Sequence, residues 1–170
     1  MRFYSFTNFM LSSIQQSIQG GHVSVELFVK YGRIPVGARG AELTKFNMLY
    51  DWADDHKTFI CLNGGNYKGV TDIARFFDDE KNPYPFAAFY EDLESLGGLM
   101  TSVGIVVPEK IYVLAEFERQ DISSVEYIRV PGEDMWTTSF INSAGDREEC
   151  TVSLWERDLI GTINMCGMAR

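Results

Sequence analysis

The sequence has little of what a disordered, secreted or membrane-bound protein needs. It has 5 prolines and 15 glycines among 170 residues, of which 45% are hydrophobic and 23% charged. This composition excludes a disordered, collagen-like or low-complexity chain, and a chain of this length can bury a core without disulfides or metals. No apolar run approaches the roughly 20 residues of a membrane-spanning helix, and the first residues lack the apolar segment of a secretory signal. We therefore expect a soluble, cytoplasmic protein that does not enter membranes.

Metal-binding residues are also scarce. The chain has three scattered cysteines, Cys61, Cys150 and Cys166, and two histidines, His22 and His56. An odd number of cysteines without a Cys-x-x-Cys pair argues against a disulfide framework or a zinc site. We expect three reduced thiols, no metal and no cofactor.

Two common catalytic signatures are absent. The chain has no Gly-x-Ser-x-Gly elbow, which leaves a serine-hydrolase triad without an anchor. It also has no glycine-rich phosphate loop, because Gly64-Gly65-Asn66 is followed by Tyr67 and Lys68 and indicates a turn. We do not expect hydrolysis of nucleoside triphosphates.

Positive charge is in short supply, since 15 Lys and Arg accompany 24 Asp and Glu and the net charge is −9. Nucleic-acid affinity comes largely from cations that neutralise phosphates, so a long duplex is not an expected ligand. The balance reverses in residues 30–45, where Glu42 is accompanied by four basic residues. We call these four the basic window: Lys30, Arg33, Arg39 and Lys45. It could hold one end of a nucleic acid.

Apolar periodicity predicts an α/β domain in residues 1–111, with a sheet covered by helices. Strands are expected over residues 2–10, 57–63, 86–90 and 101–107, the second as a buried central strand. Helices are expected over residues 12–31, 41–55 and 68–79. In the first helix, Ser12 or Ser13 would be the cap, and the buried stripe would be Ile14, Ile18, Val25 and Phe28 or Val29.

Glycine and tryptophan positions add three expectations. The Gly20-Gly21 pair inside the first helix costs about 1 kcal/mol per glycine relative to alanine, so either another segment approaches the backbone there or the helix breaks. Residues 32–40 are a loop by composition. Trp52 is expected in the core.

Residues 112–170 are more acidic and are predicted to form strands. Four β-type stretches are expected, over residues 112–118, 125–130, 135–140 and 150–155. The predicted organisation is a domain of residues 1–111 and an acidic, β-rich extension of residues 112–170 packed on it. The extension could be a partner surface or a dimer edge, or could simply cover apolar surface.

Candidate catalytic residues lie on the first expected helix and at the end of an expected strand. Gln19 and His22 are three residues apart and share a helix face. Glu91 and Asp92 end an expected strand, so their side chains point to opposite sides. A histidine and a carboxylate held together can orient and deprotonate a water molecule. Taken singly, a helical histidine is more often structural and an acidic pair is more often solvated.

A threonine or serine hydroxyl is a further candidate group. Thr101 or Ser102 follows a loop that contains Gly97-Gly98, and either side chain could donate its hydroxyl.

The order of these segments resembles the type II (archaeal and eukaryotic-type) peptidyl-tRNA hydrolases. Gln19–Val23 stands in the place of that family's Q-x-S-H-A element. Four further segments carry the resemblance: Leu49–Trp52 at the end of a helix, Lys57–Leu62 in the middle strand, Phe89–Asp92 in the strand that ends in an acid, and Thr101–Pro108 in the closing strand. The likeness covers about residues 1–111 and extends to uncharacterised phage-encoded members of the superfamily.

The resemblance implies a mixed sheet with helices on both faces and hydrolysis of the ester that joins a peptide to the 3′-ribose of tRNA. Asp92 would activate the water, with Glu91 as the alternative. The other implied site residues are His22 and Gln19, which would position the water, and Thr101, which would bond near the ester. Backbone N–H groups at Gly20-Gly21 would stabilise the oxyanion.

The tRNA acceptor end would lie on the basic window, and a phage-encoded protein would act in the host cytoplasm. Three features differ from the family. Ser13–Gln15 replaces a lysine-bearing element, Asp92–Gly98 replaces a longer loop, and the net charge is −9.

The alternative function is a non-catalytic phage-type module whose pocket binds a small molecule, a nucleotide or a host protein, and which could form a homodimer.

Overall fold

The computed structural model describes residues 1–34, 37–120, 125–142 and 144–168. Contacts divide the chain into two compact units, one formed by residues 1–107 with the chain from residue 166 onward, and the other by residues 108–165. The sequence suggested a boundary after residue 111, which lies inside helix α5 (Glu109–Gln120). Within the described residues, no helix is both long enough and apolar enough to span a membrane.

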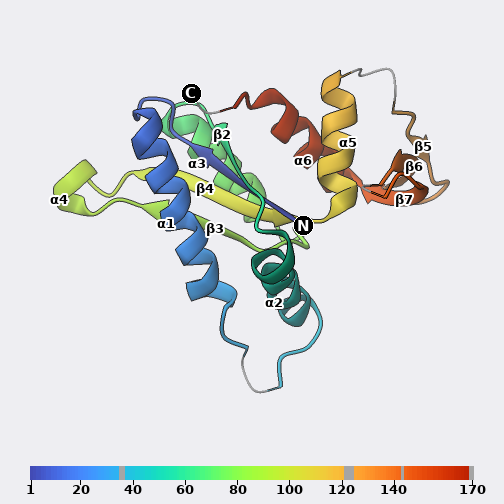
Figure 1. The fold of residues 1–170 in the computed structure, drawn as a ribbon, viewed down its shortest axis with the longest axis horizontal. Coiled ribbons are helices and arrows are strands. Elements are labelled where there is room, and N and C mark those ends of the chain that lie inside the picture. Colours follow the sequence, from blue (N-terminus) through green and yellow to red (C-terminus); the bar gives the residue numbers. More distant parts are fainter. Residues whose placement is uncertain (35–36, 121–124, 143, 169–170) are drawn as a thin grey trace. The chain divides into compact units, whose positions relative to one another are not determined.

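The first unit is a mixed α/β domain with helices on both faces of a sheet (Figure 1). Its strands are β1 (Arg2–Thr7), β2 (Phe59–Asn63), β3 (Phe86–Tyr90) and β4 (Met100–Val107). Its helices are α1 (Ser13–Tyr31), α2 (Ala41–Asp51), the π-helical turn η1 (Trp52–His56), α3 (Tyr67–Phe77) and α4 (Leu93–Leu96). The predicted order of strands and helices is confirmed, with α4 as an addition. Residues 35 and 36 of the expected loop lie outside the described part of the chain.

The strand order is β2-β1-β4-β3, with β1 parallel to β2 and β4 antiparallel to both β1 and β3. The prediction of a central strand at residues 57–63 is therefore wrong, because β2 lies at an edge. The C-terminal segment pairs with the end of this edge. The Asn63 N–H donates to the Gly167 carbonyl at 2.7 Å, and Leu62 pairs with Met168.

Helices α1 and α2 with η1 cover one face of the sheet, and α3 covers the other (Figure 1). The core of the first face consists of Phe3, Val23, Leu27, Leu49, Trp52, Ala87 and Val106. Trp52 is thus confirmed as a core residue, and its indole N–H donates to the Thr58 carbonyl at 2.9 Å. On the second face, Phe77 of α3 packs edge-on against Phe6 and Phe86.

Helix α1 buries a different side from the predicted one. Ile14, Ile18, Val25 and Val29 are exposed, and Phe28 is half-buried. The buried residues are Gln16, Gln19, Gly20, Val23 and Leu27. Apolar periodicity misidentified the buried side because the sheet beneath the first half of α1 carries hydroxyl groups, which bind glutamine side chains. The Ser12 cap is confirmed, and it forms a capping box with Gln15.

The second unit contains α5, a three-stranded antiparallel sheet and a final helix. The sheet has the order β5 (Ile128–Arg129), β6 (Met135–Ile141) and β7 (Arg147–Ser153), and α6 (Leu154–Met165) follows. The prediction of a strand over residues 112–118 is wrong, because these residues are helical. The expected strand over residues 150–155 ends at Ser153, where α6 begins. The extension is therefore mixed α/β rather than simply β-rich.

Candidate functional site

Three of the predicted site residues form a continuous row of hydrogen bonds in the first unit. The Thr101 hydroxyl donates to Gln19 Oε1 at 3.0 Å, and Gln19 Nε2 donates to Glu91 Oε1 at 2.5 Å. Gln19 comes from α1, Glu91 directly follows β3, and Thr101 belongs to β4. A carboxylate only accepts hydrogen bonds, so the amide group of Gln19 must direct its nitrogen toward Glu91. The row therefore fixes the orientation of all three side chains.

A β-bulge directs Thr101 toward α1. Phe89 pairs with Ser102 and Tyr90 pairs with Met100, so Thr101 is an extra residue in β4. A bulge of this kind rotates the side chain that it carries, and bulges are common beside active sites. Glu91 is held by the same irregular end of the sheet, because its N–H donates to the Leu99 carbonyl at 3.0 Å.

Gly20 lets α1 approach the sheet closely at this position. A Cβ atom on Gly20 would lie 2.6 Å from the Phe59 ring and 3.1 Å from the Ser5 hydroxyl. The helix passes through Gly20 and Gly21 without a break. The close-approach expectation is confirmed for Gly20. The expected oxyanion role is wrong, since N–H groups inside a helix already bond to carbonyls four residues back.

His22 lies one turn along α1 from Gln19 and is exposed. Its ring packs edge-on against Phe89, with 4.5 Å between the ring centroids. Phe89 belongs to β3 and lies two residues before Glu91. The imidazole is therefore held beside the hydrogen-bonded row by a residue that the sequence did not single out. A strand residue next to a predicted catalytic acid is the signal that could have identified it.

The two candidate carboxylates differ in their surroundings. Glu91 is half-buried and bonded to Gln19, whereas Asp92 is exposed at the N-cap position of α4. The Asp92 backbone carbonyl accepts from the Gly98 N–H at 3.3 Å, which closes the turn around α4. The structure thus brings Glu91, and not Asp92, onto the Thr101–Gln19 pair.

The basic window does not surround this row. Lys30 lies eleven residues beyond Gln19 on α1, which is about 16 Å along the helix axis. Arg33 and Arg39 are exposed in the segment between α1 and α2, and Lys45 is half-buried on α2. A ligand that contacts both the row and the basic window must therefore extend along α1.

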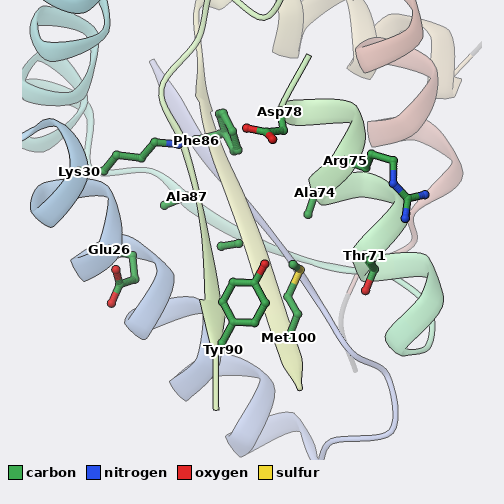
Figure 2. A pocket seen from close by; sticks show the side chains of 11 residues that line it. Glu26, Lys30, Thr71, Ala74, Arg75, Asp78, Phe86, Ala87, Tyr90 and Met100 are labelled. Atoms are coloured by element: carbon green, nitrogen blue, oxygen red, sulfur yellow. The ribbon is translucent and has the colours of Figure 1, made fainter. Parts of the chain in front are cut away.

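A groove of about 420 Å³ lies along the outer edge of β3 (Figure 2). Lys30 and Glu26 of α1 lie on one side, and Thr71 and Arg75 of α3 lie on the other with Asp78, the residue that caps α3. The floor is formed by Phe86, Ala87, Ala88, Tyr90 and Met100. The consecutive alanines leave this edge open, and they are the sequence signal from which the groove could have been predicted.

Lys30 is directed into this groove rather than toward the other members of the basic window. Its Nζ lies 3.8 Å from the centre of the Phe86 ring. Burial lowers the pKa of Lys30, and the nearby Asp78 carboxylate offsets part of that change. In this environment, a ligand anion that contacts Lys30 would replace some of its lost hydration.

The cysteines and acids do not form a metal site in the described residues, where no three His, Cys, Asp or Glu side chains gather. Burial raises the pKa of the Cys61 and Cys150 thiols, which disfavours the thiolate form that binds metals and attacks esters. Within the row, the Glu91 carboxylate is the group that can accept a proton, and Gln19 is the group that orients it. No protein family model matches the chain, and no curated protein is significantly similar to it.

Proposed function

We propose that the protein hydrolyses an ester of the peptidyl-tRNA type by attack of an activated water molecule on the ester carbonyl. The observation that supports this function best is the row Thr101–Gln19–Glu91, with His22 held beside it. The fold proposed with it is that of the type II peptidyl-tRNA hydrolases. The order of elements in residues 1–107 and the mixed sheet with helices on both faces support that assignment.

Glu91 is the proposed general base. Gln19 binds one of its carboxylate oxygens, and the other can accept a proton from the attacking water. The Gln19 amide fixes the direction of the carboxylate. Thr101 contributes indirectly, because its hydroxyl holds the oxygen end of the Gln19 amide whose nitrogen binds the carboxylate.

His22 is the proposed partner of the leaving group. Its exposed ring can donate a proton to the ribose oxygen that departs when the ester breaks, or hydrogen-bond to that oxygen. The second N–H of Gln19 Nε2 is the proposed donor to the developing oxyanion, in place of the Gly20-Gly21 amides. The acceptor end of the tRNA would follow α1 toward Arg33 and Arg39.

A second candidate function is binding without catalysis, and the groove along β3 favours it. The groove combines an open strand edge with two cations and two anions, and is separate from the Thr101–Gln19–Glu91 row. An extended peptide of a host protein could add a strand to such an edge. Binding of this kind would not depend on Glu91 or His22.

The direct test is release of labelled peptide from diacetyl-lysyl-tRNA at low salt by wild-type protein and by His22→Ala. We expect turnover by the wild type and at least a tenfold lower kcat/KM in the variant, which corresponds to about 1.4 kcal/mol of transition-state stabilisation. His22 is exposed, so its replacement should leave the fold intact.

The matched control is His56→Ala, which removes the other histidine of the chain, also exposed, at the end of η1. It should keep the wild-type rate. Absence of turnover in a folded wild-type sample would reject the hydrolase and favour the binding function. Equal rates in the wild type and His22→Ala would reject the role of His22.

A further inference from the structure

The outer face of α1 carries an exposed row of apolar side chains along its whole length. Ile14, Ile18, Val25 and Val29 are 73%, 49%, 60% and 70% exposed. At 3.6 residues per turn, these positions lie on one side of the helix, opposite the buried residues. We call these four residues and Gly21 the α1 stripe. Contiguous apolar surface of this kind commonly marks an interaction site.

The α1 stripe carries no charge. Residues 13–25 contain no Asp, Glu, Lys or Arg, although 23% of the chain is charged. The charged residues of α1 are Glu26 and Lys30, and both line the groove on the β3 side. Because copies with a net charge of −9 repel one another, an uncharged face is where two copies can approach at least cost.

No contact within the chain explains why residue 21 is a glycine. It costs about 1 kcal/mol relative to alanine inside a helix, and a Cβ atom there would meet nothing within 4 Å. Its neighbour Gly20 differs, since the sheet excludes any side chain at that position. A glycine in the middle of an exposed apolar stripe lets a second helix approach closely, because interaxial distance depends on the side chains at the crossing.

The spacing of the α1 stripe suits a second copy of α1 as the partner helix. The pairs Ile14–Val29 and Ile18–Val25 are both centred between residues 21 and 22. A two-fold axis at that centre places Ile14 against Val29 of the other copy, and Ile18 against its Val25. An interface between identical copies needs this self-complementarity. The spacing of the α1 stripe meets this requirement.

We infer that the protein forms a two-fold homodimer in which the α1 helices of two copies pack antiparallel across Gly21. Glu26 and Lys30, which line the groove on the β3 side, then lie away from the α1 stripe, so no like charges meet across it. His22 lies at the border of the interface. The inference rests on α1 alone and not on the proposed hydrolysis.

The first test is the mass in solution of the full chain over a range of concentrations, by analytical ultracentrifugation. We expect the wild type to approach twice 19.3 kDa, and Ile18→Glu and Gly21→Leu to remain monomeric. Gly21→Leu is informative because no neighbour in the chain opposes the added side chain, so the monomer should fold with at least wild-type stability. Ile128→Glu, at an exposed apolar residue of β5, should still dimerise.

The second test distinguishes antiparallel from parallel packing by oxidative cross-linking. Gly21→Cys lies at the proposed axis and should form a disulfide between copies, whereas Val29→Cys should not, because it faces Ile14. The wild type, with its three native cysteines, gives the background. A monomeric wild type, a dimer that survives both Ile18→Glu and Gly21→Leu, or equal cross-linking of the two cysteine variants would overturn the inference.

Discussion

At the scale of single residues, the candidate site depends on how Gln19 is oriented. The sequence predicted Gln19, Thr101 and the acidic pair as candidates, but alternation along a strand could not decide which acid faces the helix. The bulge between β3 and β4 and the turn around α4 determine which acid faces α1, and regular alternation does not predict either of them. Phe89 was missed for another reason, since its contact with His22 joins two elements far apart in the sequence.

Thr101→Val tests the orienting role of the hydroxyl. The variant keeps the shape of the side chain but leaves the buried Gln19 Oε1 without its donor, so the amide that positions Glu91 is held at one end only. We expect a loss of about 1–3 kcal/mol in the free energy of unfolding and at least a tenfold fall in kcat. Thr101→Ser, which restores the hydroxyl, should recover most of the activity. Wild-type kcat in a folded Thr101→Val variant would contradict the role.

At the scale of elements, strands and helices in residues 1–107 were predictable, whereas the side that α1 buries was not. Four apolar residues at helical spacing predict a buried stripe, but here they lie opposite the core. In residues 108–165, β-branched and aromatic residues suggested strands where α5 forms. The spacing of Ile111, Leu114 and Ala115 was the helical signal. For α6, the signal was the capping box of Ser153 and Glu156, whose reciprocal bonds are 3.1 and 2.8 Å.

The two adjacent glycines of α1 give a matched prediction about stability. Gly20→Ala places a methyl group against the Phe59 ring and the Ser5 hydroxyl, so we expect it to destabilise the protein by about 1–3 kcal/mol. Gly21→Ala meets no atom of the chain and should stabilise the helix by up to about 1 kcal/mol. Urea unfolding in dilute solution measures both changes. Equal effects of the two substitutions would show that α1 does not pack on the sheet as described.

At the scale of the whole molecule, charge limits what the protein can bind. A net charge of −9 repels phosphates, and the basic window is the largest local reversal of that charge in the sequence. Composition predicted this balance directly. It could not predict that Lys30 turns into the groove beside Phe86, away from Arg33 and Arg39, because that depends on the position of β3 beneath α1.

The salt dependence of tRNA binding measures this limit. Each phosphate neutralised contributes roughly 0.9 to the slope of log K against log salt, so four cations allow a slope of at most about 4 in magnitude. An Arg33→Gln, Arg39→Gln double variant should lower that magnitude by about 2. A slope unchanged in the double variant would place the tRNA elsewhere on the surface.

The central claim is that Glu91, held by Gln19, is the carboxylate that activates water. The most direct measurement compares kcat/KM of Glu91→Gln and Asp92→Asn on the same peptidyl-tRNA substrate. The two substitutions remove one charge each from adjacent residues, and they differ in whether the carboxylate is bonded to Gln19. We predict that Glu91→Gln loses at least about a hundredfold, as expected for a general base, while Asp92→Asn stays close to the wild type. A large loss in Asp92→Asn with little change in Glu91→Gln would contradict the account.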